Sequence, residues 1–209
     1  MSIQPQRGGA RWVKALGVNG PGTPPIVPKL VASNNTLALF AGDWLEELAD
    51  GTVYPCTTGG GAHPKLSYVM VSADRYLGSD GLLRKGQFVP AATVYTGVVS
   101  LSNPLSTVVL CIPVENQIFE VDIPTAAATW TAATALIGKC ADIIATAGST
   151  VNGLSGHTSV AVANFEATTV SGQMLLREVP EYGMDGRAND PTTTYWKGWF
   201  QAYETLAVV

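Results

Sequence analysis

The chain has 209 residues, of which 46% are hydrophobic and only 13% are charged, and its formal net charge is −4. This composition excludes a disordered chain, which needs low hydrophobicity and high charge, and it gives no overall attraction to nucleic acid or to an anionic membrane. Sparse charge also predicts wide apolar patches of the kind that contact other chains, so we expect self-association or a large partner.

Glycine (22 residues) and proline (13 residues) are spread along the whole chain, which favours many short elements bounded by turns over long helices. The three cysteines, Cys56, Cys111 and Cys140, have no CxxC spacing, and two of them lie in apolar runs. We therefore predict buried free thiols. No stretch approaches the roughly 20 apolar residues of a membrane span, so we expect no membrane partner.

Residues 1–28 predict an extended basic arm. The segment contains Arg7, Arg11 and Lys14 without an acidic residue, and a Pro-Pro pair near its end excludes a helix there. We expect Arg7, Arg11, Trp12 and Lys14 to bind a partner that orders the arm. A flexible terminus is the alternative.

Residues 29–209 predict a β-rich domain, either undivided or split into sub-lobes over about 29–115 and 116–209. The fold class is all-β with at most one or two short helices, as a β-barrel or sandwich-like domain that carries the N-terminal arm. In chain order, strands are predicted near Thr36–Phe40, Trp44–Leu48, Thr52–Tyr54, Leu66–Ala73, Thr93–Val99, Thr107–Ile112, Gln117–Ile123, Thr158–Phe165 and Gln173–Val179.

Two glycine-containing turns join predicted strands. Asp50-Gly51 predicts a hairpin turn, because such a turn needs positive φ and glycine accepts it without steric cost, and Ser79-Asp80-Gly81 predicts another. From Phe119 to Ile123, apolar and acidic residues alternate. This alternation predicts a strand with one buried face and one solvated acidic face.

Residues 132–147 differ from the rest, because their apolar residues recur at steps of three and four and so predict a short helix. Gly138 opposes the helix by about 1 kcal/mol relative to alanine, and a β interpretation with Gly138 at a bend stays open. Near the C-terminus, aromatic residues on both sides of Gly198 favour a strand over a helix.

Tests for reactive motifs fail. His63 and His157 are each surrounded by turn residues and lack the neighbouring ligands of a zinc site, so both are expected in loops. Ser155 and His157 match a nucleophile elbow only nominally and should share one loop. Residues 185–190 carry oxygen donors without the alternating acids and terminal glutamate of a calcium loop. We predict no enzyme activity and no catalytic, metal or cofactor site.

Three segments resemble the capsid decoration proteins of tailed bacteriophages, also called cement or head auxiliary proteins. In residues 41–55 the similarity lies in Gly42-Asp43 and in an Asp-Gly-Thr-Val hairpin, and in residues 86–93 it lies in a strand that ends at Pro-Ala. From Phe119 to Val179 it lies in the order Gly-x-x-Ala-Asp, Asn-Gly, Ser-Gly and Gln-x-Leu-x-Arg. The resemblance covers about residues 37–205.

This resemblance implies a small β-barrel or tulip-like β fold and a structural protein of the phage virion without enzyme activity. It implies the major capsid protein as partner, assembly as trimers or dimers on the capsid surface, and synthesis in the host cytoplasm. Closed symmetry is the usual way to bury apolar surface between copies, so we expect a homotrimer.

Two other functions stay open. The chain can be a different head or tail β module of a virion, or a carbohydrate-binding β module. The second function requires exposed aromatic stacking platforms, for which the candidates are Trp44, Trp130, Trp196 and Trp199. If these tryptophans are buried in the core, they cannot serve as stacking platforms for a sugar.

Overall fold

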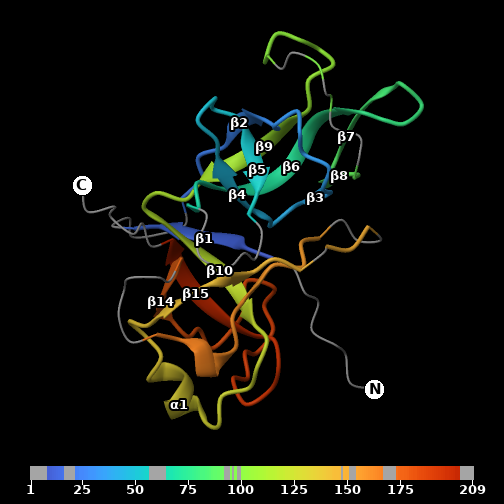
Figure 1. Ribbon diagram of the computed structural model, residues 1–209. Helices are drawn as coiled ribbons and strands as arrows, with labels where there is room; N and C mark the ends of the chain where they lie inside the picture. The colour runs from blue at the N-terminus through green and yellow to red at the C-terminus, as the bar shows by residue number, and fades with distance from the viewer. Residues whose placement is uncertain are drawn as a thin grey trace.

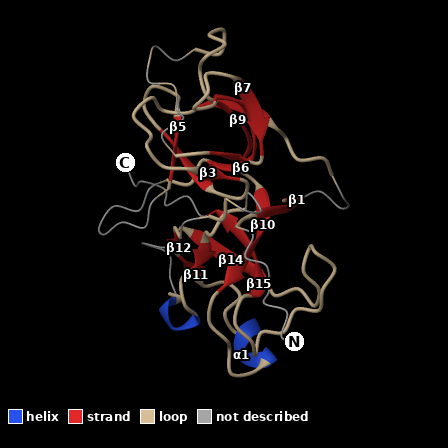
Figure 2. Cartoon of the chain, turned by 90° about the vertical axis from the view of Figure 1, so that its right-hand side faces the viewer, coloured by secondary structure: helices blue, strands red, loops and turns tan. Residues whose placement is uncertain are grey.

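The structure is a computed structural model of the chain. It describes residues 9–16, 22–56, 65–91, 95, 97, 100–146, 148–150, 154–166 and 173–202. Two groups of antiparallel strands form an upper lobe and a lower lobe in the view of Figure 1, and Figure 2 shows the same division from the side. The all-β fold class is confirmed, with one α-helix of five residues in the described part of the chain.

The upper lobe is built on an open sheet with the strand order β2-β9-β6-β4-β5, in which β7 also pairs with β6. A separate ribbon is formed by β3 and β8. The bounds of these strands are β2 Val27–Leu30, β3 Leu39–Phe40, β4 Trp44–Glu47, β5 Val53–Pro55, β6 Tyr68–Leu77, β7 Leu83–Gly86, β8 Phe88–Val89 and β9 Val108–Pro113.

The lower lobe is built on an open sheet with the strand order β1-β10-β15-β14-β11, and β12 pairs with β13 beside it. Its elements are β1 Arg11–Ala15, β10 Gln117–Ile123, α1 Trp130–Thr134, β11 Cys140–Ala141, β12 Ile143–Ile144, β13 Thr158–Ser159, a 3-10 turn at Val162–Asn164, β14 Met174–Glu178 and β15 Trp196–Ala202. The chain passes from one lobe to the other between β9 and β10.

The segment expected as an arm contributes strands to both lobes. Residues 11–15 are β1, which pairs with β10 at one edge of the lower sheet, and residues 27–30 are β2, which pairs with β9. Residues 1–8 and 17–21 lie outside the described residues. The extended conformation of residues 11–15 is thus stabilised within the chain, and a role for the arm in binding a partner stays a prediction.

Both predicted glycine turns occur at hairpins. Gly51 has φ +79° between β4 and β5, and Gly81 has φ +78° between β6 and β7. Most predicted strands are present with slightly shifted ends, and the C-terminal strand is β15. The segment Thr158–Phe165 is a strand only at its first two residues, and most of Thr93–Val99 lies outside the described residues.

The main core lies on one face of the lower sheet and continues onto the upper sheet. Phe119, Val121 and Ile123 of β10 point into it together with Phe200 of β15. Trp44 of the upper lobe packs edge-on against Phe119, with ring centroids 5.2 Å apart. A second cluster fills the upper lobe, and the three cysteines are buried and free as predicted.

The prediction of a solvated acidic face on β10 is wrong. Glu120 and Asp122 are 1% and 2% exposed, because the loop between β14 and β15 covers them and donates the Met184 backbone N–H to Glu120 at 2.7 Å. Asp122 forms an ion pair with the buried Lys197 of β15, and Arg11 of β1 lies 3.9 Å from Glu120. The strand alternates as predicted, but both of its faces are buried.

The helix predicted over residues 132–147 is also wrong in extent. The helix begins after Thr129, whose hydroxyl accepts a hydrogen bond from the Ala132 N–H at 3.1 Å, and it ends at Thr134. Gly138 has φ +88° and donates to the Leu176 carbonyl at 2.9 Å, so the chain turns there into β11. The alternative with Gly138 at a bend is confirmed. None of the described helices is long and apolar enough to cross a membrane.

Gly198 of β15 gives a first stability prediction. A Cβ atom there would lie 2.7 Å from the Phe200 ring, 2.8 Å from Leu176 and 2.9 Å from Ile123, so a side chain overpacks the core. We expect Gly198→Val to lower the free energy of unfolding by about 1–3 kcal/mol, measured by urea denaturation.

Gly86→Val in β7 is the matched control for that variant. A Cβ at this exposed strand glycine would meet nothing closer than 3.7 Å, so we expect a change within about 0.5 kcal/mol. Equal losses for both variants would show that loss of glycine itself, and not crowding by the core, causes the effect.

The buried ion pair gives a second prediction. Lys197→Met removes the ammonium group beside Asp122, and we expect a loss of about 3–5 kcal/mol of unfolding free energy because the carboxylate stays buried without this partner. Lys85→Met is the control, since Lys85 pairs with Asp74 at 3.1 Å while its own side chain is 78% exposed, and it should change stability by less than about 1 kcal/mol. Chemical denaturation of both variants measures these losses of unfolding free energy. A loss for Lys197→Met as small as that for Lys85→Met would contradict the prediction.

Candidate functional site

A tight turn at Phe40–Asp43, which we call the junction turn, lies where the two lobes meet. Gly42 has φ +91°, and the Asp43 N–H donates to the Phe40 carbonyl at 3.0 Å. The Asp43 carboxylate folds back over the turn and accepts the Phe40 N–H at 2.8 Å. Two hydrogen bonds with the Met70 backbone, each below 3.0 Å, attach the turn to β6. The carboxylate is therefore fixed by its own turn.

His157 reaches the junction turn from the lower lobe. The Ser155 N–H donates to the Ala41 carbonyl at 3.0 Å, and the Trp44 N–H donates to Nδ1 of His157 at 3.3 Å. The other ring nitrogen, Nε2, lies 3.5 Å from Oδ1 of Asp43. His157 is 5% exposed and Asp43 is 2% exposed. The loop position predicted for His157 is correct, but the side chain is buried in a contact between the lobes.

Burial opposes charge on both members of this pair. Desolvation raises the pKa of Asp43 above its ordinary value, and the nearby His157, the Ser155 hydroxyl and the Phe40 N–H offset part of the rise. Desolvation lowers the pKa of His157, and the charge of Asp43 works against that decrease. Because Nδ1 accepts a backbone N–H, a neutral imidazole here carries its proton on Nε2, facing Asp43.

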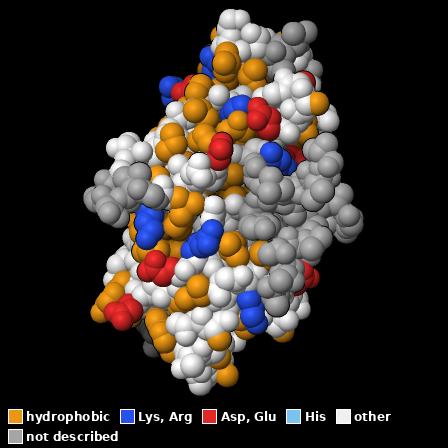
Figure 3. All heavy atoms as spheres, turned by 90° about the vertical axis from the view of Figure 1, so that its left-hand side faces the viewer, with side chains coloured by type: hydrophobic (Ala, Val, Ile, Leu, Met, Phe, Trp, Pro, Cys, Tyr) orange, Lys and Arg blue, Asp and Glu red, His pale blue; other side chains and the backbone are white. Residues whose placement is uncertain are grey.

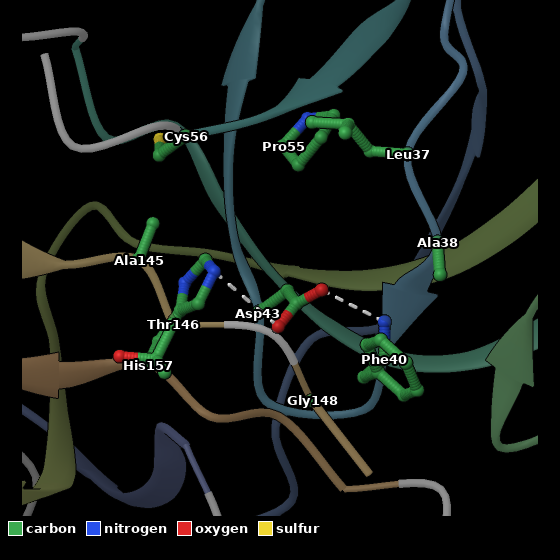
Figure 4. Close-up of a pocket in the computed structure, with 10 residues that line it drawn as sticks. All are labelled: Leu37, Ala38, Phe40, Asp43, Pro55, Cys56, Ala145, Thr146, Gly148 and His157. Atoms are coloured by element: carbon green, nitrogen blue, oxygen red, sulfur yellow. Dashed lines mark hydrogen bonds and ion pairs between the residues drawn. The ribbon is translucent and has the colours of Figure 1, made fainter. Parts of the chain in front are cut away.

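A pocket of about 330 Å³ opens beside the pair (Figure 4). The upper lobe and the lower lobe both contribute to its walls. Its lining is mostly apolar, and Asp43 and His157 come together at one wall. The lining residues are Leu37, Ala38, Phe40, Asp43, Pro55, Cys56, Ala145, Thr146, Gly148 and His157.

The pocket does not arrange its polar groups for nucleophilic attack. A serine nucleophile needs a free histidine nitrogen to take its proton, but Ser155 faces Asp43 and accepts the His157 backbone N–H at 3.0 Å, while both ring nitrogens of His157 face other groups. Burial, with the charges of Glu46 and Asp43, raises the pKa of the Cys56 thiol and disfavours the reactive thiolate. Neither Ser155 nor Cys56 is therefore activated as a nucleophile at this pocket.

Metal binding also lacks a described site. Within the described ranges, no group of three or more His, Cys, Asp and Glu side chains is placed to hold an ion. In residues 185–190, Asp185 accepts the Arg187 N–H and Asp190 accepts the Thr192 N–H. These carboxylates therefore close local turns, which agrees with a polar loop.

The residues predicted to bind a partner contact the protein's own lower lobe. Arg11 faces Glu120, and the Trp12 indole donates to the Gln117 side chain at 2.7 Å. Lys14 lies 3.7 Å from Glu178 and 4.9 Å from the centre of the Trp199 ring. All three side chains remain partly exposed. Arg7 lies outside the described residues, and partner binding by this set stays a prediction.

The tryptophans do not form the row of exposed platforms that a carbohydrate-binding module needs. Trp44 and Trp196 are 0% and 2% exposed and belong to the core. Trp199 is partly buried beside Lys14. Trp130 is 39% exposed at the start of α1, and a single ring gives no extended sugar-binding surface.

Sequence reasoning did not find the Asp43–His157 pair. The two residues of the Trp44–His157 hydrogen bond are 113 positions apart, so no local spacing connects them. The available signal was that Asp43 and His157 each follow a glycine. Such glycines indicate tight turns but do not show that two turns meet.

Comparisons with protein-family models, with curated proteins and with solved structures find no match for this chain. Its function must therefore be inferred from the residues and from their geometry.

The pair predicts opposite pH effects for two variants. His157 has a folded-state pKa below its ordinary 6.5, so the unfolded chain binds more protons and this group removes stability as pH falls below about 6.5. Asp43 has a folded-state pKa above its ordinary 3.8, so it removes stability as pH rises above about 3.8. Between about pH 4 and 6.5 the two contributions oppose each other.

We expect His157→Asn, which can still accept the Trp44 N–H, to make stability rise less steeply with pH over this range. Asp43→Asn should make it rise more steeply. Urea denaturation at half-unit pH intervals measures both slopes against the unmodified protein. Slopes that change in the same direction for the two variants would contradict the assigned shifts.

Proposed function

We propose that this protein is a structural component of a tailed-bacteriophage virion, a decoration protein that binds the major capsid protein and stabilises the capsid surface. The reason for proposing a phage capsid is the resemblance of residues 41–55, 86–93 and 119–179 to such proteins. The structural observation that supports the proposal is the hairpin β6–β7, which projects from the upper lobe (Figure 1) and whose strand β7 is exposed along its whole length.

Every residue of β7 is exposed, although the strand pairs regularly with the end of β6. Leu82 and Leu83 at the tip are 62% and 52% exposed. Leu82 and Leu83 belong to neither core cluster, so they add little to stability, since their apolar area stays in water. Two adjacent exposed leucines on a projecting hairpin favour a contact with another protein.

Two ion pairs lie within the hairpin near its tip. Arg84 lies 2.6 Å from Asp80, and Lys85 lies 3.1 Å from Asp74. Both pairs are exposed and add little to stability, but they leave the tip without a net charge of either sign. Its contact would therefore depend on apolar area more than on charge.

The surface shown in Figure 3 supports binding to other chains as well. Apolar side chains extend over both lobes on this face, with single lysine, arginine and acidic groups between them. Because only 13% of the residues are charged, few charged groups interrupt this apolar surface. Burial between copies in a closed homotrimer, placed on the capsid, would cover it, and three repeated contacts would add avidity.

The hairpin provides the test of this proposal. Heads that lack the protein are mixed with the purified chain, and binding is measured by co-sedimentation. The double variant Leu82→Ser, Leu83→Ser should bind at least about tenfold more weakly, because a loss of only about 1.4 kcal/mol of apolar contact gives that factor. Its melting temperature should match that of the unmodified protein, since both leucines are exposed.

Ile137→Ser is the control, because Ile137 is 45% exposed in the lower lobe after α1, and it should leave binding unchanged. Heads saturated with the unmodified protein should also release their DNA at a higher temperature than bare heads, by mass action. A chain that stays monomeric and never sediments with heads would contradict the decoration function. Unchanged binding of the leucine variant would contradict the role of the hairpin.

A further inference from the structure

Asp122 of β10 and Lys197 of β15 are paired directly across two neighbouring antiparallel strands. The Lys197 ammonium contacts Oδ1 of Asp122, and the Lys197 and Asp122 side chains are only 9% and 3% exposed. Side chains of directly paired residues lie on the same face of a sheet, so the register of the strands brings them together. The amine and the carboxyl group are therefore held in contact away from solvent.

A second carboxyl group lies beside this pair. Glu120 precedes Asp122 by two residues on β10, so both side chains lie on one face of the strand, and the Glu120 side chain is 2% exposed. Desolvation raises the pKa of Glu120, and the Met184 N–H and the charge of Lys197 offset part of the rise. Burial thus favours the protonated form of Glu120 close to the lysine.

The loop between β14 and β15 covers this group of side chains. Its Met184 N–H donates to Oε2 of Glu120 at 2.7 Å. A Cβ atom added to Gly183 would lie 3.4 Å from Cγ of Lys197 and 3.6 Å from Oε2 of Glu120, so the loop backbone packs on both side chains. The Asn189 side chain hydrogen-bonds the N–H and the carbonyl of Lys197, at 2.7 Å and 2.9 Å. The loop therefore fixes the lysine and excludes water.

We propose that Lys197 and Asp122 become joined by an intramolecular amide bond, which the folded chain forms itself with Glu120 transferring the proton. Proton exchange within the ion pair gives a neutral amine and a carboxylic acid. Nζ of Lys197 then bonds to Cγ of Asp122, and the carboxyl O–H group leaves as water after taking a proton from Glu120. Glu120 regains a proton from Nζ, so the sum is one amide and one water. This inference goes beyond the decoration function and does not depend on it.

Two physical effects favour the amide over a lasting ion pair. A buried ion pair carries the desolvation cost of both charges, whereas an amide is neutral. Contact between the amine and the carboxyl group also replaces a bimolecular encounter, and effective concentrations in such arrangements reach roughly 10⁵–10⁸ M. Lys85 and Asp74 lack the first effect, because their side chains are 78% and 34% exposed and both ions stay hydrated.

The mass of the unmodified protein tests the bond directly. Loss of one water should place the intact mass about 18 Da below the sequence mass, after correction for N-terminal processing. Trypsin does not cleave after an acylated lysine, so residues 86–139 and 188–209 should appear as one joined fragment. A mass equal to the sequence mass, or a water loss confined to one of these two peptides, would overturn the inference.

Variants of the two joined residues test the atom balance. Lys197→Arg keeps a cation but forms no amide, so it should have its full sequence mass, whereas the control Lys85→Arg should keep the loss of about 18 Da. Asp122→Asn should still form the bond but release ammonia, a loss of about 17 Da. A water loss that persists in Lys197→Arg or in Asp122→Asn would place the reaction elsewhere and overturn the inference.

Glu120→Gln tests the proton transfer, because it keeps the shape of the side chain and removes the acid. Bond formation should become about 100-fold slower or more, so that most of the freshly purified variant has the sequence mass and loses water over time. Complete bond formation in freshly purified, folded Glu120→Gln would overturn the role of Glu120.

Discussion

The segment Ala41–Trp44 holds the two lobes together, because every one of its backbone N–H and C=O groups is hydrogen-bonded. The N–H groups donate to Gln87, Met70, Phe40 and the His157 ring, and the carbonyls accept from Ser155, Ala10, Met70 and Cys56. These partners come from both lobes and include the residue that precedes β1. Buried backbone groups that lose partners are costly, so this segment fixes the position of the strands around it.

The candidate site follows from the same segment. Once the turn brings Asp43 inward at the junction, its carboxylate is removed from water, and the lower lobe places the polar groups of His157 and Ser155 next to it. The pocket has walls from both lobes because it lies at this junction. By contrast, the hairpin β6–β7 extends away from the junction and keeps its apolar tip exposed. The chain thus separates a buried polar contact, which organises the fold, from an exposed apolar projection suited to a partner.

Much of the local structure could be predicted because it depends on neighbouring residues. Gly51 and Gly81 supply the positive φ that their hairpins need, and runs of β-forming residues give β4, β6, β9, β10 and β14 close to their predicted positions. The burial of the cysteines follows from the apolar runs around them. The bend at Gly138 is also a local feature that the sequence indicates. The helical spacing of the apolar residues around it was misleading, because the residues that follow form β11, which pairs with β14.

The tertiary structure alone decided what covers each face and which turns meet. Alternation in β10 shows that Glu120 and Asp122 share a face, but only the loop before β15 and Lys197 show that this face is buried. Likewise, sequence places Asp43 and His157 in turns, and only the packing of the lobes brings them together. The reason is that local sequence determines the conformation and the two faces of an element, whereas burial and pairing depend on residues many tens of positions away, whose approach no local pattern encodes.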